Sequence, residues 1–147
     1  MTKKSNLEQI HTLANSIRRT YNRLRQITDQ IHDDTNLSAP KRTLLLDLQR
    51  EGPQTVPALA AFRCVSRQIT QIQVNELLDA GYVQTVANPA HKRSPLIALS
   101  KNGEKIVNAM ITKELEFLEK LSWLPKMDAV ESCKKVLDSI YDHLNQL

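Results

Sequence analysis

The stretch SRQITQIQVNELLDAG, from Ser66 to Gly81, decides the fold of this chain. Ser66 is a typical residue for capping a helix N-terminus, and Gly81 is typical of the position just after a helix ends. A spacing of about 100° per residue puts Thr70, Val74 and Leu77 on one face of this helix. The opposite stripe holds Gln68, Gln71, Ile72 and Asn75. The stretch therefore predicts a helix with a buried face and an amide-rich outward face.

The amide-rich stripe has two interpretations, base readout or a solvated surface. Solvated helix faces tend to carry Lys and Glu, whereas Asn and Gln can bond bidentately to the adenine edge in a major groove, so base readout is favoured. Arg67 is a candidate for phosphate or guanine contact, and Ser66 can touch a phosphate from the helix N-terminus. An outward Ile72 either meets a thymine methyl group or packs partially against its neighbours.

The segments around this helix complete a recognisable order of elements. Two shorter helices precede it, one capped by Ser38 and stopped by Gly52-Pro53, the next capped by Thr55. Two alternating segments follow it, at 82–87 and 94–99, around a polar turn that carries Lys92 and Arg93. Three helices and a hairpin over residues 37–100 predict a winged helix-turn-helix module, with the two cations placed to contact phosphate or the minor groove.

Both flanking regions carry narrow apolar stripes at alternating three- and four-residue steps. One runs from residue 7 to 31, and the other follows the break at Pro125. Such seams predict partner helices, although the first helix could instead pack on its own chain. We expect dimerisation through regions 5–34 and 101–147 of a single chain 1–147. The predicted contacts are Leu7, Ile10, Ile17, Val130, Leu137, Ile140 and Leu144. The predicted fold is mainly α with a small β-hairpin wing, a winged helix-turn-helix core flanked by N- and C-terminal dimerisation helices.

Composition narrows the function. The net charge of +4 is compatible with DNA binding, while 4% aromatic residues argue against a single-strand stacking platform. The apolar runs are too short for a membrane span, and no catalytic motif, metal-ligand spacing or cofactor motif is found, which predicts a non-enzymatic cytoplasmic protein without cofactors. Cys64 and Cys133 are expected to be structural, with a redox-sensor role for Cys64 as the weaker alternative.

The stretch from Leu37 to Val107 resembles the multiple-antibiotic-resistance regulator (MarR) family. The resemblance rests on Val65-Ser66-Arg67-Gln68, on residues 74–83 (VNELLDAGYV), and on the hairpin exit from Arg93 to Gly103. It implies a dimer held by the terminal helices, palindromic duplex DNA as target, and often a small anionic or phenolic ligand that releases the DNA.

The chain departs from the family pattern at several positions. The wing usually has Asp-x-Arg, but here His91 stands at the Asp position, so the carboxylate that would brace Arg93 is missing. On the fourth helix, Thr70 and Gln73 stand where aliphatic residues are common, and Ile72 stands where a basic residue is common.

Two functions follow from these patterns. The first is a homodimeric transcriptional repressor that binds double-stranded DNA, and the resemblance implies that a small ligand could release it. The basic flank formed by Arg18, Arg19, Arg23 and Arg25 could receive such an anion, but a solvated helix face is the favoured explanation of these residues. The alternative is a winged-helix module that binds protein without DNA readout, and Ile69 and Ile72 keep it open. The candidate DNA contacts are Ser66, Arg67, Gln68, Gln71, Ile72, Asn75, Lys92 and Arg93.

Overall fold

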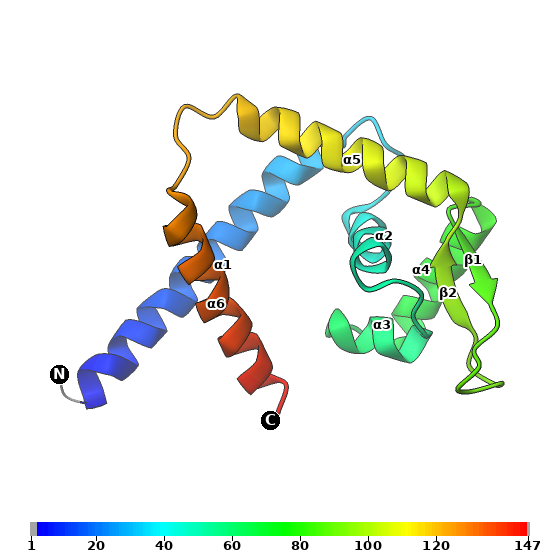
Figure 1. Cartoon of the computed structure of the whole chain (residues 1–147), viewed down its shortest axis with the longest axis horizontal. Helices are drawn as coiled ribbons and strands as arrows, with labels where there is room; N and C mark the ends of the chain where they lie inside the picture. Colours follow the sequence, from blue (N-terminus) through cyan, green and yellow to red (C-terminus); the bar gives the residue numbers. More distant parts are fainter. Residues whose placement is uncertain (1–2, 147) are drawn as a thin grey trace. The chain divides into compact units, whose positions relative to one another are not determined.

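A computed structural model describes residues 3–146 of the chain, with side chains from residue 6 onward. Its elements follow the predicted order (Figure 1). They are α1 (Lys3–Ile31), α2 (Ala39–Glu51), α3 (Val56–Phe62), α4 (Arg67–Asp79), β1 (Val83–Val86), β2 (Leu96–Leu99), α5 (Lys101–Glu119) and α6 (Met127–Leu144). The expected class, mainly helical with one antiparallel hairpin, is confirmed, and both strands are shorter than predicted.

The chain forms two compact units, one ending at Leu115 and one beginning at Glu116. The predicted division into a module at 37–100 and helical regions at 5–34 and 101–147 is a different partition and stays a prediction; residues 1, 2 and 147 lie outside the described residues. Across residues 3–146, every helix falls short of the length or apolarity that a bilayer span requires.

The helix boundaries near the site follow from capping residues. The Ser66 hydroxyl accepts a hydrogen bond from the Ile69 amide at 3.2 Å, and the Thr55 hydroxyl accepts one from the Ala58 amide at 3.3 Å. Ser38 occupies the N-cap position of α2 but its side chain makes no capping bond. Gly81 follows α4 with φ 75°, a conformation that glycine adopts without a steric cost. The predicted start of α3 and both predicted limits of α4 are therefore confirmed.

A single apolar core holds α2, α3, α4, the hairpin and the first half of α5 together. It removes the apolar faces of these short elements from water, which is the main favourable term in folding. Its buried members are Leu37, Leu44, Leu45, Leu48, Leu59, Val74, Leu77, Val83, Ile97, Val107 and Met110.

The hairpin is fixed in place on two sides. Its strands pair antiparallel from Val83↔Leu99 to Val86↔Leu96, and Gln54 exchanges two backbone hydrogen bonds with Ile97. On the other side α5 approaches so closely that a Cβ at Gly103 would lie 1.9 Å from the Tyr82 carbonyl oxygen. Because only glycine fits there, Gly103 sets the direction in which α5 leaves the wing.

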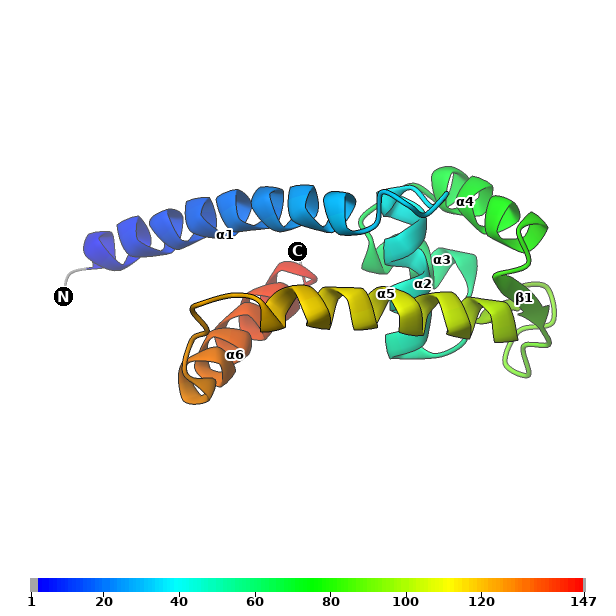
Figure 2. The ribbon, with the colours of Figure 1, turned by 90° about the horizontal axis from the view of Figure 1, so that it is seen from above.

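The end of α1 is tied to the module by polar contacts. His32 is 1% exposed, and its Nε2 lies 2.9 Å from Glu114 Oε1 on α5. Arg42 of α2 donates to the Leu37 carbonyl at 2.7 Å and forms an ion pair with Asp29 of α1. These contacts fix where α1 joins the module, and Figure 2 shows α1 continuing away from it.

Candidate nucleic-acid interface

The two faces of α4 separate as the sequence predicts. Thr70, Val74 and Leu77 are fully buried, and Thr70 also donates to the Ser66 carbonyl at 3.0 Å. The opposite stripe is exposed, and its members are Gln68, Gln71, Ile72 and Asn75. A helix anchored in this way presents a fixed set of side chains to a ligand.

Two of the outward amides are joined to each other. Gln71 Nε2 donates to Asn75 Oδ1 at 2.9 Å, across one turn of α4. An amide has two N–H donors and a carbonyl acceptor, so the pair still offers Gln71 Oε1 and the Asn75 NH₂ group to a ligand. The hydrogen bond limits the rotamers of both side chains before any ligand binds.

The isoleucines of α4 remain half open to solvent. Ile69 is 49% exposed and Ile72 is 51% exposed. Partial packing of Ile72 against its neighbours, the alternative left by the sequence, therefore leaves about half of the side chain available for contact.

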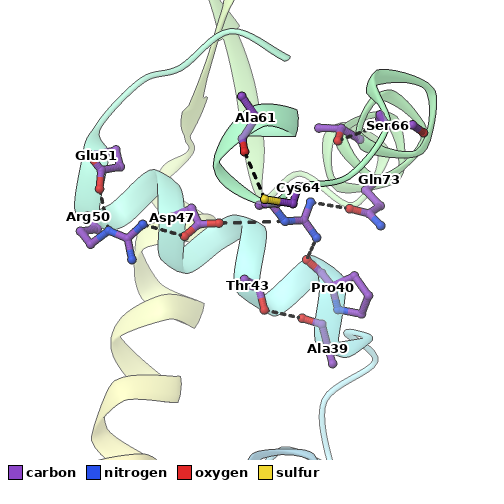
Figure 3. Close-up of polar contacts among 12 residues, drawn as sticks. Ala39, Pro40, Thr43, Asp47, Arg50, Glu51, Ala61, Cys64, Ser66 and Gln73 are labelled. Carbon is purple, nitrogen blue, oxygen red and sulfur yellow. Dashed lines mark hydrogen bonds and ion pairs between the residues drawn. The ribbon is translucent and has the colours of Figure 1, made fainter. Parts of the chain in front are cut away.

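A buried arginine holds α4 against the rest of the helix-turn-helix. Arg63, in the turn between α3 and α4, donates to Gln73 Oε1 at 2.6 Å and to the Pro40 carbonyl at 2.9 Å. Its Nε lies 4.0 Å from Asp47 Oδ2, and both side chains are largely buried. Figure 3 draws the polar contacts of Pro40, Asp47 and Gln73. Asp47 also accepts from Arg50 at 3.1 Å. The guanidinium thus links α2, the turn and α4.

Burial acts on both charges of this pair. It raises the pKa of Asp47, against the opposing effect of Arg50 and Arg63. It likewise lowers the pKa of Arg63, against the attraction of Asp47. This cluster was not predicted from the sequence. The available signals were a charged Asp47 between the apolar residues of α2 and Gln73 at a position that is commonly aliphatic.

The helix-turn-helix turn also contains an unusual backbone conformation. Cys64 has φ 50°, in the left-handed region, and its Sγ lies 3.9 Å from the Ala61 carbonyl oxygen. Both Cys64 and Cys133 are exposed free thiols. Cys133 lies on α6, which has no buried residue, and its packing role stays a prediction.

The loop of the wing is closed by the side-chain amide of Asn88. Asn88 Nδ2 donates to the Ser94 carbonyl at 2.7 Å, and Asn88 Oδ1 accepts from the Ala90 amide at 3.1 Å. The tip residues His91, Lys92 and Arg93 are all exposed. Asn88 therefore closes the loop that carries both cations, a role the sequence did not indicate.

Residues of α4 and of the wing line one hollow of about 450 Å³. Arg67, Gln68 and Gln71 line it from α4, and Arg93 lines it from the wing. Four of the predicted DNA contacts thus face one concave surface that carries two arginines. Ser66, Ile72, Asn75 and Lys92 lie outside this hollow, the first three on or beside the exposed face of α4 and the last on the wing tip.

Most of the residues predicted for dimerisation are exposed. Leu7 and Ile10 of α1 are exposed, as are Val130, Leu137 and Leu144 of α6. Ile17 and Ile140 are half-buried. Over residues 3–146, no cluster of three or more His, Cys, Asp or Glu side chains could hold a metal ion.

No family model matches the sequence. Uncharacterized proteins of Mycobacterium tuberculosis and Mycobacterium bovis are 32% identical over 74 residues, which is 50% of this chain and 52% of each relative. The chain thus spans about half the length of the curated relatives it matches.

Solved structures match over most of the chain. A MarR-family transcriptional regulator from Silicibacter pomeroyi superposes with a TM-score of 0.83 at 23% identity, over 92% of this chain and 91% of that one. Overoxidized AbfR bound to DNA has a TM-score of 0.68 at 20% identity, over 97% and 99%. BpsR of Bordetella bronchiseptica, whose DNA binding is regulated by 6-hydroxynicotinic acid, has a TM-score of 0.68 at 19% identity, over 88% and 92%. The chain therefore has the winged-helix fold of the MarR-family transcription regulators.

Proposed function

We propose that this chain is a MarR-family transcriptional regulator that binds double-stranded DNA sequence-specifically and acts as a homodimeric repressor. The observation that carries the proposal is the surface shared by α4 and the wing, where outward amides lie beside Arg67 and Arg93 around one hollow. Amides supply base-edge hydrogen bonds and arginines supply phosphate contacts, so the surface combines specificity with attraction to the backbone.

The proposed homodimer is supported by the exposed apolar residues of α1 and α6. Exposed Leu and Ile side chains at helical spacing favour burial against a second copy of the same helices. A two-fold dimer would present two α4 helices about 34 Å apart on one side of the duplex, which predicts a pseudo-palindromic operator. An operator occupied in this way is closed to competing proteins, which is the basis of repression.

Release by a small anionic or phenolic ligand belongs to the same proposal. It is supported by the fold shared with the Bordetella regulator, whose DNA binding responds to an aromatic acid. Arg18 and Arg23 give α1 cationic groups, although each already bonds a neighbouring amide on its own helix.

The test compares a base-reading variant with a backbone-contact variant. Selection from a random duplex library gives the preferred site, and binding is then measured at several salt concentrations. Gln71→Ala is expected to cost about 1–3 kcal/mol on the best site and to relax preference at one position per half-site. Lys92→Ala should instead weaken all sequences alike and reduce the salt slope by about one for each phosphate that is no longer neutralised. Equal effects of both variants on all sequences would contradict base readout.

A protein-binding module is the second candidate, favoured by the half-exposed Ile69 and Ile72. It predicts that alanine at Gln68, Gln71 and Asn75 leaves any DNA preference unchanged. The same set of binding measurements therefore separates the two functions.

A further inference from the structure

We infer that α4 is built to read A·T base pairs, with Ile69 and Ile72 contacting thymine 5-methyl groups and the Gln71–Asn75 pair bonding adenine. The inference rests on the proposed function, and it names the type of base pair that α4 selects. It joins an apolar and a hydrogen-bonding chemistry among the exposed residues of one helix.

The apolar part is the pair of isoleucines. Ile69 and Ile72 are three residues apart and each is about half exposed, on a helix whose opposite face is fully buried. In the major groove, the thymine methyl group is the apolar feature of the base edges, and aliphatic side chains contact it. Isoleucines that are open in the free protein are thus suited to this group.

The surroundings of Ile72 favour DNA as the occupant over a protein. The carboxylate of Glu76, one turn further along, is held by Lys41 Nζ of α2 at 2.6 Å, which offsets a charge that would repel phosphate. Arg67 begins the same helix, and Arg93 shares its hollow. The cations at the start of α4 and on the wing are complementary to a polyanion.

The hydrogen-bonding part is the Gln71–Asn75 pair. Its internal hydrogen bond leaves a carbonyl oxygen on Gln71 and an NH₂ group on Asn75, which match the N6 donor and N7 acceptor of adenine. Because the two side chains already restrain each other, less conformational entropy is lost when they bind a base.

Ile72 and Asn75 are placed to act on the same or adjacent base pairs. At about 100° per residue, Ile72 lies about 60° from Asn75 around the helix, whereas Gln71 lies about 100° from Ile72 and joins the group through its hydrogen bond to Asn75. An A·T pair shows the adenine N6 and N7 groups and the thymine methyl group on one major-groove edge. The face therefore combines the two chemistries that identify this base pair.

The experiment uses base analogues in the duplex selected by the full-length protein. Replacing thymine by deoxyuridine removes only the methyl group, and is expected to weaken wild-type binding about fourfold at each contacted position. Replacing adenine by 7-deazaadenine removes only the N7 acceptor, and should weaken binding about tenfold. Both substitutions are scanned one position at a time through the half-site.

Two variants assign each effect to its side chain and serve as controls for each other. Ile72→Ala should bind the thymine and deoxyuridine duplexes equally at one position while keeping its response to 7-deazaadenine. Asn75→Ala, which removes the NH₂ group assigned to N7, should show the opposite pattern. Both positions are exposed and helical, so unchanged melting temperatures verify that the variants fold.

Failure of the inference and failure of the proposed function give different results. The inference is overturned if the protein binds its site specifically but deoxyuridine does not change the affinity at any position, and Ile69→Ala and Ile72→Ala do not change it either. In that case the proposed regulator function is retained, and the isoleucines are assigned to a protein contact. If the full-length protein shows no sequence preference in any duplex, the proposed function falls and the inference falls with it.

Discussion

At the scale of single residues, the backbone of Cys64 is the clearest strained conformation in the helix-turn-helix. Its φ of 50° falls where a side chain with a Cβ is disfavoured by about 1–2 kcal/mol. The residue lies in the turn just before the cap Ser66, so the strain sits where the chain redirects itself into α4. Glycine would adopt the same backbone without that steric conflict.

We therefore expect Cys64→Gly to keep or raise the free energy of unfolding, by up to about 1 kcal/mol after the greater freedom of glycine in the unfolded chain is subtracted. Cys64→Val should lower it by about 1 kcal/mol or more, because a β-branched residue fits the left-handed region worst. Urea unfolding of the two variants and of the parent measures the difference. A glycine variant less stable than the valine variant would contradict this account of the turn.

The residue scale also explains why the wing could not be read fully from the sequence. His91 replaces the carboxylate that would brace Arg93, and the sequence indicated no other bond within the loop, whereas the structure has Asn88 bonding Ser94 and Ala90. A side-chain bond across six residues depends on the path of the loop, and sequence patterns do not determine that path.

At the scale of elements, periodicity predicted what each helix buries and exposes. The helical period separated the buried Thr70, Val74 and Leu77 from the outward amides, and the caps at Thr55 and Ser66 gave the helix limits. The same reasoning could not find the contacts of Arg63 with Gln73, Asp47 and Pro40, which lie 10 to 23 residues away. Those contacts arise only once α2, α3 and α4 pack.

This buried ion pair gives the element-scale prediction. Asp47→Asn leaves the largely buried Arg63 without its counter-charge and is expected to lower the free energy of unfolding by about 3 kcal/mol. The double variant Asp47→Leu/Arg63→Met should recover most of that loss, because apolar residues of similar volume need no desolvation of charge. Chemical denaturation of the single and double variants gives both values.

An exposed ion pair provides the matched control. Asp34 pairs with Lys113, and this hydrogen bond lowers the pKa of Asp34, but the pair lies in solvent. Asp34→Asn should therefore leave stability nearly unchanged at neutral pH. If Asp34→Asn and Asp47→Asn were equally costly, burial would not be the cause of the effect at Asp47.

At the scale of the whole molecule, both compact units leave apolar side chains uncovered. In the unit that contains α1, Leu7 and Ile10 are exposed; in the unit that contains α6, Leu137 and Leu144 are exposed. The sequence predicted these stripes from their spacing. Whether a stripe meets a second copy or its own chain depends on an association that a single-chain pattern does not determine.

The last prediction tests that association. Leu137→Asp combined with Ile140→Asp places two charges in the apolar stripe of α6, and burying them at an interface would cost several kcal/mol. We expect the wild-type protein to sediment as a dimer at micromolar concentration and the double variant to sediment as a monomer or to unfold. Lys135→Asp combined with Ser139→Asp is the control, because it adds two Asp residues on the opposite side of the same helix.

The consequence for DNA follows from two-fold symmetry. A dimer binds two half-sites at once, whereas a monomer has one α4 helix and lacks the affinity that binding of the second half-site adds. The α6 variant should therefore bind a half-site and the full palindrome with similar affinity, while the control variant prefers the palindrome as the wild type does. A wild-type protein that sediments only as a monomer would remove the reason for a palindromic operator, because the separation of two reading helices is what sets the half-site spacing.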